Sequence, residues 1–301
     1  MAEEINEGSG AHSLTRKAAA KINLYLHITD RRPDGYHELD SLAVFAGVHD
    51  VITLAPADTL TLDITGPFAD GLEAGPENLA LKAAERLQQA TGLTRGCAIG
   101  LQKNLPVSSG IGGGSADAAA VLDGLMDFWK INPKTLDLHG VALELGADVP
   151  VCLYGRGAYV SGIGDEIVKG PPLPDAWLVL VNPGVSVSTP DVFKARKGSF
   201  NIEDRLEGPP TSAAHLAQFL SSRYNDLTEA AISFAPAIGA ALEALKKTEG
   251  CLLSRMSGSG ATCFGIYDAE DAATIARSAI VEAQPGWWVQ AAPLLDNTRV
   301  S

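Results

Sequence analysis

Cysteine is scarce in this sequence, and its spacing excludes two common uses of it. The 301 residues contain four cysteines and no CxxC pair. Scattered thiols of this kind form neither a disulfide framework nor a zinc site, and they are typical of a reducing compartment. The histidines show no ligand spacing either, so we expect no structural metal. We expect the thiols to pack as small hydrophobic groups; they are Cys97, Cys152, Cys251 and Cys263.

Basic residues are few relative to acidic ones. Lys and Arg total 23 against 36 Asp and Glu, which gives a formal net charge of −13. Nucleic-acid binders carry a basic footprint, so we expect no nucleic-acid partner. No apolar run approaches the roughly 18 residues of a transmembrane helix, and the acidic N-terminus is unlike a signal peptide. The composition therefore predicts a soluble cytoplasmic protein with no membrane partner. An anionic small-molecule partner requires a local pocket that overrides the field of the whole protein.

The rest of the composition is that of a globular protein, with 46% hydrophobic and 20% charged residues. A chain of this length forms one large domain or two of ordinary size. Three prolines between residues 169 and 174 are typical of a linker. We therefore predict a mobile tail over residues 1–14 and two α+β domains, residues 15–172 and 173–301.

Hydrophobic periodicity predicts the elements of both domains. Residues 18–28 alternate, with Ile22 and Leu24 on one face and Lys21 and Asn23 on the other, which indicates a strand. Other strands are expected over 39–47, 50–55, 59–65, 97–103, 177–181, 251–256, 262–267 and 287–293. Helices are expected over 77–91, 115–128, 134–145, 211–222, 226–233, 236–248 and 270–283.

A glycine-rich loop, residues 106–114, precedes the helix expected from Ser115. Helix N-termini present unpaired N–H groups and partial positive charge, which suit phosphate, and glycine lets the backbone approach it closely. The loop lacks the Gly-Lys-Ser/Thr ending of a Walker A motif and the distant acidic residue of a dinucleotide fold. The candidate nucleotide-binding residues are Pro106, Val107, Ser108, Ser109, Gly110, Ile111, Gly112, Gly113, Gly114, Ser115 and Ala116.

The segment from Pro106 to Asp117 resembles the phosphate loop of the GHMP kinase superfamily, which includes galactokinase, homoserine kinase and mevalonate kinase. Two further stretches, Ala18–Leu26 and Met256–Gly265, resemble the other superfamily motifs and occur in the same order. The resemblance implies an α+β fold with two domains. The N-terminal domain would resemble ribosomal protein S5, the C-terminal domain would be ferredoxin-like, and the active site would lie in the cleft between them.

Four shorter stretches narrow the resemblance to the 4-diphosphocytidyl-2-C-methyl-D-erythritol kinase family. They are Lys21-Ile-Asn-Leu, Arg32-Pro-Asp-Gly-Tyr-His37, Gly146-Ala-Asp-Val-Pro150 and the run from Pro183 to Pro190. The family resemblance implies transfer of the γ-phosphoryl group of ATP, with Mg²⁺, to the 2-hydroxyl of a cytidine diphosphate alcohol in non-mevalonate isoprenoid biosynthesis.

The resemblance also implies catalytic roles. Asp148 is the candidate to take or guide the hydroxyl proton, with Lys21 beside it and Asn23 orienting the hydroxyl. The sequence leaves open whether Asp148 is a true base or an electrostatic anchor. Pro150 favours an extended Val149, so we expect the chain to leave the preceding helix there.

The remaining site residues are likewise implied by the resemblance. Tyr36 and Phe193 are expected to sandwich the cytosine ring, His37 to bind its edge, and Thr189 to lie near the diphosphate or the hydroxyls. Other candidates lie at the nucleotide, namely Asn78 and Lys103 near adenine and ribose and Ser115 as a phosphate or magnesium ligand. Lys103 is equally well read as an exposed residue at the end of a strand. Asp117 is expected as a first-turn carboxylate favoured by the helix dipole.

Two alternatives stay open at this point. One is a GHMP kinase for another acceptor, such as homoserine or mevalonate, which would not need the Tyr36, His37 and Phe193 set. The other is a catalytically inactive binding protein, against which the presence of both Lys21 and Asp148 argues. We expect a monomer or a weak homodimer.

Overall fold

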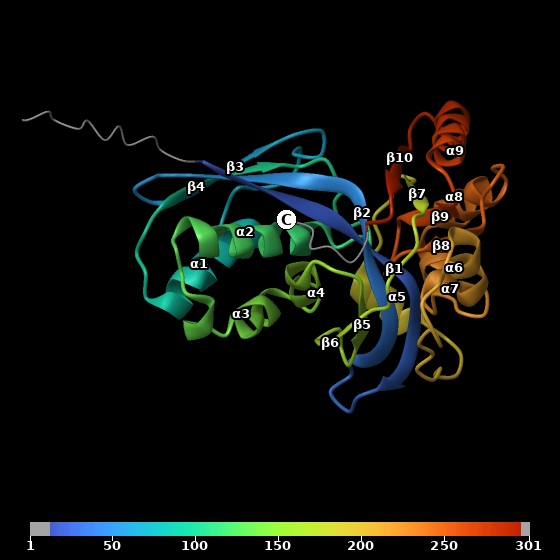
Figure 1. Ribbon diagram of the computed structural model, residues 1–301, viewed down its shortest axis with the longest axis horizontal. Helices are drawn as coiled ribbons and strands as arrows, with labels where there is room; N and C mark the ends of the chain where they lie inside the picture. Colours follow the sequence, from blue (N-terminus) through green and yellow to red (C-terminus); the bar gives the residue numbers. More distant parts are fainter. Residues whose placement is uncertain (1–12, 296–301) are drawn as a thin grey trace, which may run out of the picture.

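A computed structural model describes residues 13–295 of the chain (Figure 1). Within these residues, six strands form a first sheet in the order β3-β4-β2-β5-β6, with β1 also paired to β2. β3 and β4 are parallel, and the other pairs are antiparallel. The strands are β1 (Leu14–Arg31), β2 (His37–Ala55), β3 (Leu60–Thr65), β4 (Cys97–Gln102), β5 (Ala158–Ser161) and β6 (Glu166–Lys169).

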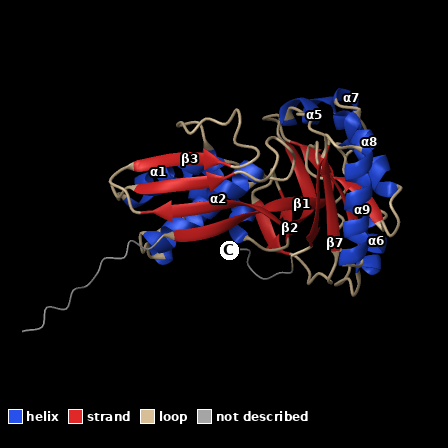
Figure 2. Ribbon diagram, turned by 90° about the horizontal axis from the view of Figure 1, so that it is seen from above, coloured by secondary structure: helices blue, strands red, loops and turns tan. Residues whose placement is uncertain are grey.

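Helices of the N-terminal half cover one face of this sheet, as Figure 2 shows for α1 and α2. They bury a core of alanine and branched aliphatic side chains against the strands, including Leu54, Leu87 and Ile99. The helices are α1 (Leu79–Thr91), α2 (Gly113–Phe128), α3 (Leu138–Leu145) and α4 (Val149–Tyr154), with a 3₁₀ turn at Pro133–Thr135.

The C-terminal half forms a second, antiparallel sheet in the order β10-β7-β9-β8. In chain order this is 4-1-3-2, with α8 between the first two strands and α9 between the last two, which is the ferredoxin-like arrangement. The strands are β7 (Trp177–Asn182), β8 (Leu253–Met256), β9 (Cys263–Tyr267) and β10 (Trp288–Pro293). The helices are α5 (Thr189–Ala195), α6 (Ala213–Leu220), α7 (Thr228–Phe234), α8 (Ala237–Lys246) and α9 (Glu270–Ala283).

The long strands β1 and β2 connect the two halves. Figure 1 shows both, in blue, running from the first sheet to the second. Ile22 and Leu24 of β1 belong to the same buried cluster as Leu178 of β7 and Phe264 of β9. Residues 18–28 are therefore buried on both faces, including the face on which the sequence places polar groups.

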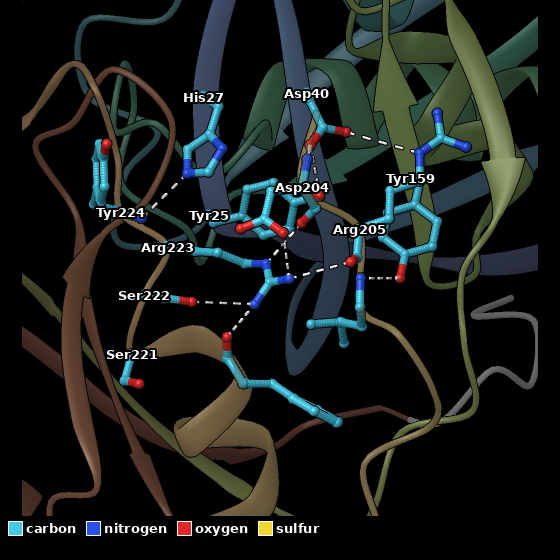
Figure 3. A network of polar contacts seen from close by, with 12 residues as sticks. Tyr25, His27, Asp40, Tyr159, Asp204, Arg205, Ser221, Ser222, Arg223 and Tyr224 are labelled. Carbon is cyan, nitrogen blue, oxygen red and sulfur yellow. Dashed lines mark hydrogen bonds and ion pairs between the residues drawn. The ribbon is translucent and has the colours of Figure 1, made fainter. Parts of the chain in front are cut away.

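A polar network fixes the loop before α6 against these strands (Figure 3). Asp40 is fully buried, and its Oδ2 accepts hydrogen bonds from the Tyr25 hydroxyl at 2.9 Å and from the Asp204 N–H at 2.9 Å. Arg223 in turn donates to the Asp204 carboxylate at 2.7 Å. A buried carboxylate needs such donors, because its desolvation is otherwise costly.

Three sequence predictions about the strands and helices are wrong. The strands expected over 39–47 and 50–55 are one strand, because the expected gap at residues 48 and 49 lies at a β-bulge in which residues 46–48 lie opposite Ala20. Val149 is not extended, because Pro150 occupies the first turn of α4, where its missing N–H has no intrahelical partner. The helix expected over 134–145 is divided at Asp137, which caps α3.

The predicted tail lies mostly outside the described residues, which begin at residue 13, and Leu14 already belongs to β1. The boundary between domains at residue 172 stays a prediction.

The cysteines are free thiols, with Cys97 and Cys263 buried. Among residues 13–295, no helix combines the length and apolar character that a membrane span requires.

Phe264 tests how strongly the second sheet holds the long strands. Its side chain is fully buried at their contact, so Phe264→Ala should lower the free energy of unfolding by about 3–5 kcal/mol. Phe234→Ala, which truncates a ring that is 54% exposed, should change it by no more than about 0.5 kcal/mol. Urea denaturation of both variants checks this; equal losses would contradict the packing described.

Candidate active site

The glycine-rich loop is held by the motif Met256–Gly265 of the C-terminal half. The Thr262 N–H donates to the Ser109 carbonyl at 3.0 Å, and the Ser257 hydroxyl donates to the Gly110 carbonyl at 3.0 Å. Gly110 has a φ of +73°, and a Cβ there would lie 2.5 Å from the Ser257 carbonyl oxygen. Only glycine permits this approach.

The side chains of the loop face different directions. Ile111 is fully buried, Ala116 is buried, and the Ser109 hydroxyl donates to the Pro106 carbonyl at 2.7 Å. These three therefore support the loop rather than present a polar group to a ligand. The backbone at the start of α2 is more open, with Gly112 as N-cap and Ser115 half-buried in the first turn.

A cavity of about 200 Å³ lies beside the loop. It collects the candidate residues for adenine and ribose, Asn78 and Lys103, together with part of the loop. Its lining is Leu72, Glu77, Asn78, Leu79, Leu101, Lys103, Pro106, Val107, Ser108, Gly113, Gly114 and Asp117. The Asn78 amide is already engaged, since its Oδ1 accepts from the Ala80 N–H at 3.0 Å as the cap of α1 and its Nδ2 donates to the Glu73 carbonyl at 3.2 Å.

Lys103 is buried rather than exposed at the end of its strand. Its Nζ lies 2.5 Å from the Asp50 carboxylate and 2.6 Å from that of Asp117. Burial opposes the charge of Lys103, but the two carboxylates outweigh it and raise its pKa. Burial and the nearby Asp50 raise the pKa of Asp117 to about 7, against the lowering effect of Lys103. The expectation of Asp117 as a first-turn carboxylate is wrong, because Asp117 is the fifth residue of α2 and lies beyond its first turn. Its carboxylate belongs to a buried ion pair with Lys103 instead.

The structure brings Lys21, Asn23 and Asp148 together. The Lys21 Nζ lies 3.0 Å from Asp148 Oδ2 and donates to Asn23 Oδ1 at 2.9 Å. The Lys21 side chain is 4% exposed and that of Asp148 46%, so the lysine lies behind a carboxylate that remains accessible. Asp148 is the N-cap residue of α4.

This trio lies directly against the glycine-rich loop. The Lys21 N–H donates to the Ile111 carbonyl at 3.0 Å. A Cβ at Gly112 would lie 3.3 Å from Lys21 Cε, so the loop backbone and the lysine side chain are in contact. A phosphate bound at the start of α2 would therefore lie beside the Lys21–Asp148 pair.

Two more candidates, His37 and Phe193, lie beside each other where β1 ends and β2 begins. The rings of His37 and Phe193 have centroids 5.5 Å apart, whereas Tyr36 is 62% exposed. Burial lowers the pKa of His37, as do the nearby Arg31 and Arg196. Thr189 begins α5, and its hydroxyl lies 2.7 Å from that of Ser259.

Several residues of the site were not among the sequence candidates. Ser257 and Ser259 lie inside the second glycine motif, where only the glycines attracted notice, so the motif itself could have indicated them. Asp50 and Ser41 lie within strands, and no local pattern marks them. Ser41 accepts a hydrogen bond from the Asn23 amide at 2.7 Å.

Comparison with known proteins shows the family of this chain. Residues 78–156 match the family described as GHMP kinases N terminal domain, and residues 209–284 match GHMP kinases C terminal. A 4-diphosphocytidyl-2-C-methyl-D-erythritol kinase from Paramagnetospirillum magneticum is 53% identical over 283 residues, which cover 94% of this chain and 99% of that protein. The chain belongs to the 4-diphosphocytidyl-2-C-methyl-D-erythritol kinase family. A family member from Rhodospirillum rubrum is 48% identical and covers 96% of this chain and 95% of its own length.

Solved structures agree with this family. A crystal structure of 4-(cytidine 5'-diphospho)-2C-methyl-D-erythritol kinase superposes with a TM-score of 0.78 at 34% identity, over 93% of this chain and 99% of that one. A homoserine kinase from Cytophaga hutchinsonii reaches 0.73 at 18% identity over 98% of both chains, which shows the shared fold alone. The family and the α+β fold predicted from the motifs are confirmed, and the chain is a GHMP-type kinase, a phosphotransferase that uses ATP.

Asp117 gives a pH-dependent prediction. Because its pKa is raised in the folded protein, the folded state binds the proton more tightly than the unfolded chain does. The stabilisation of the folded state by this tighter proton binding is complete below pH 3.8, the ordinary pKa of an aspartate. It is lost as the pH rises to about 7. Between pH 5 and 7 the urea midpoint of the wild type should therefore fall relative to that of Asp117→Asn, and the two should run parallel above pH 7.

The matched control is Asp127→Asn, which removes an exposed carboxylate of the same helix and should leave the slope of the wild type unchanged. Parallel midpoints for the wild type and Asp117→Asn across the whole range would contradict the assignment.

Proposed function

We propose that this kinase phosphorylates the 2-hydroxyl of 4-diphosphocytidyl-2-C-methyl-D-erythritol with ATP, giving the 2-phosphate and ADP in non-mevalonate isoprenoid precursor biosynthesis. The observation that carries the proposal is the Lys21–Asp148 pair, 3.0 Å apart and in contact with the glycine-rich loop through Lys21. The names of the similar proteins supply the acceptor, and the His37–Phe193 pair is consistent with its cytosine ring.

The nucleotide would occupy the cavity and the loop together. We assign adenosine to the cavity lined by Asn78 and Lys103, and the phosphates to the backbone N–H groups from Gly112 to Ser115. Anions are stabilised there by the helix dipole and by the unpaired N–H groups. Such local binding is needed because the net charge of the protein is −13.

Magnesium would enter with ATP rather than through a preformed protein site. Among residues 13–295, no three His, Cys, Asp or Glu side chains gather as metal ligands, and Asp117 is committed to Lys103. Mg²⁺ keeps several waters and is commonly held by one or two protein groups plus substrate phosphates. The Ser115 hydroxyl is the protein ligand we assign to it; when bound, the ion neutralises phosphate charge.

Asp148 and Lys21 would act on the acceptor hydroxyl. Asp148 accepts the proton of this hydroxyl, because its carboxylate is accessible. Lys21, beside it, stabilises the negative charge of the carboxylate before the transfer. Asn23 holds Lys21 in place, and it stays our candidate to orient the hydroxyl. Thr189 would bind the diphosphate or the hydroxyls beside the second glycine motif.

Cytosine would stack on Phe193, with Tyr36 closing over it from the exposed turn. Stacking contributes about 1–3 kcal/mol per base but tolerates any base. His37 supplies the discrimination, because its lowered pKa favours the neutral imidazole, which has one donor and one acceptor for the base edge. We further propose a cytoplasmic monomer or weak homodimer that acts without a nucleic-acid or membrane partner.

The decisive experiment is a coupled ADP-release assay with magnesium-ATP and three acceptors offered separately: the cytidyl diphosphate methylerythritol, homoserine and mevalonate. Turnover with the first alone is expected. Turnover only with homoserine or mevalonate would support the kinase activity but reject the proposed cytidyl substrate. Absence of turnover with all three, in protein that binds ATP, would favour an inactive binding protein.

Replacement of Asp148 tests its role as base. Asp148→Asn should lower kcat at least about 100-fold, because the amide cannot take a proton, while the Kd for ATP should change by no more than about twofold. Asp137→Asn, which alters the cap of the neighbouring helix α3, is the matched control and should retain the wild-type kcat. An Asp148→Asn enzyme within about tenfold of the wild type would remove Asp148 from the mechanism.

Replacement of Phe193 tests the cytosine pocket. Phe193→Ala should raise KM for the cytidyl substrate about tenfold or more and leave KM for ATP unchanged, because it removes the stacking surface beside His37. Phe234→Ala, on the exposed face of α7, provides the aromatic control. Unchanged affinity for the cytidyl substrate in Phe193→Ala would place the base elsewhere.

A further inference from the structure

Ser41 of β2 is a buried hydroxyl that contacts the Asn23 amide but lies outside the catalytic trio. Its exposed fraction is 0%, and that of Asn23 is 5%. In the pairing of β1 with β2, Asn23 lies opposite Ala43 and Leu26 opposite Ser41, so β1 carries one extra residue between them. Such a bulge interrupts the ladder hydrogen bonds. The Tyr25 carbonyl, inside the bulge, accepts a hydrogen bond from Ser41 Oγ at 2.6 Å.

The single proton of the Ser41 hydroxyl is therefore committed. A carbonyl oxygen only accepts, so Ser41 donates to Tyr25, and its oxygen is left to accept. The group that it contacts, at 2.7 Å, is the Asn23 amide. Only the NH₂ end of that amide donates, so Ser41 requires Nδ2 on its own side.

The opposite end of the amide faces Lys21. The ammonium group only donates, and it lies 2.9 Å from Asn23 Oδ1. A flipped amide would bring two acceptors together at Ser41 and two donors together at Lys21. The backbone of Asn23 is held separately, since its N–H donates to Ser257 Oγ at 3.1 Å. Ser41 therefore fixes which end of the Asn23 amide faces Lys21.

We propose that Ser41 is a positioning residue of the active site: through the Asn23 amide it aims the Lys21 ammonium at Asp148. This inference rests on the phosphoryl transfer proposed above. The chain of contacts runs from the Tyr25 carbonyl through Ser41 and Asn23 to Lys21 and ends at the accessible carboxylate, 3.0 Å from Nζ. Ser41 itself touches neither substrate, because it is fully buried.

Kinetics of three variants test the proposal. Ser41→Ala should lower kcat about tenfold and leave KM for ATP and for the cytidyl substrate within about twofold, because the binding surfaces are untouched. Ser41→Thr keeps the hydroxyl and should retain most of kcat, whereas Ser41→Val, of the same shape, should not. Ser161→Ala removes another buried strand serine, whose hydroxyl donates to Glu166 at 3.0 Å, and should retain the wild-type kcat.

Amide NMR provides a readout that needs no substrate. The Asn23 side-chain NH₂ signal, identified by its loss in Asn23→Ala, should exchange slowly with solvent in the wild type, in Ser41→Thr and in Ser161→Ala. Exchange should be at least about tenfold faster in Ser41→Ala and Ser41→Val. Unchanged exchange in Ser41→Ala would overturn the proposed hold on the amide.

The two proposals fail in distinguishable ways. Absence of turnover in the wild type, or an active Asp148→Asn enzyme, would reject the proposed chemistry, and the NMR result would still report on the amide. With an active wild type and an inactive Asp148→Asn enzyme, a wild-type kcat in Ser41→Ala would overturn the role of Ser41. Equal losses in Ser41→Thr and Ser41→Val would overturn it as well, since they would report packing alone.

Discussion

The burial of the Lys21 ammonium is the interaction on which the rest of the active site depends. Lys21 lies on a strand that is covered on both faces, and a buried charge is tolerated only when it is paired and hydrogen-bonded. Asn23 supplies one partner from the same strand, and Asp148 supplies the other from the start of α4. Meeting this requirement leaves a carboxylate at the edge of the buried region, accessible to a substrate hydroxyl.

The two glycine motifs are packed against each other. A Cβ at Gly110 would lie 2.5 Å from the Ser257 carbonyl oxygen, and one at Gly258 would lie 2.7 Å from the Gly110 carbonyl oxygen. The loop that precedes α2 is thus positioned by a segment about 150 residues further along the chain. The proposed nucleotide-binding loop, the proposed catalytic pair and the contact between the two halves of the protein therefore lie at one place.

Local pattern predicted most of the helices and strands, and its errors have physical causes. Helix α1 is capped by Asn78 at its start and by Gly92 at its end. The φ of +69° at Gly92 is the left-handed conformation that is typical of the residue after a helix. The bulge at residues 46–48 resembles a strand break, because both interrupt the alternation of side chains. Pro150 and Pro190 lie in the first turns of α4 and α5, but proline is also common just after a helix, and only neighbouring structure decides between these roles.

The sequence by itself determined the family and the glycine-rich loop, and it proposed Lys21, Asp148, His37 and Phe193 as site residues, because the motifs are short local patterns that can be read directly from the chain. Tertiary structure alone decided how they are supported. The Lys103 ion pair joins residues 53 and 14 positions apart, and Ser41 reaches Asn23 through a bulge in the pairing of β1 with β2. Side-chain direction within a strand follows from register, and register is set by the whole sheet.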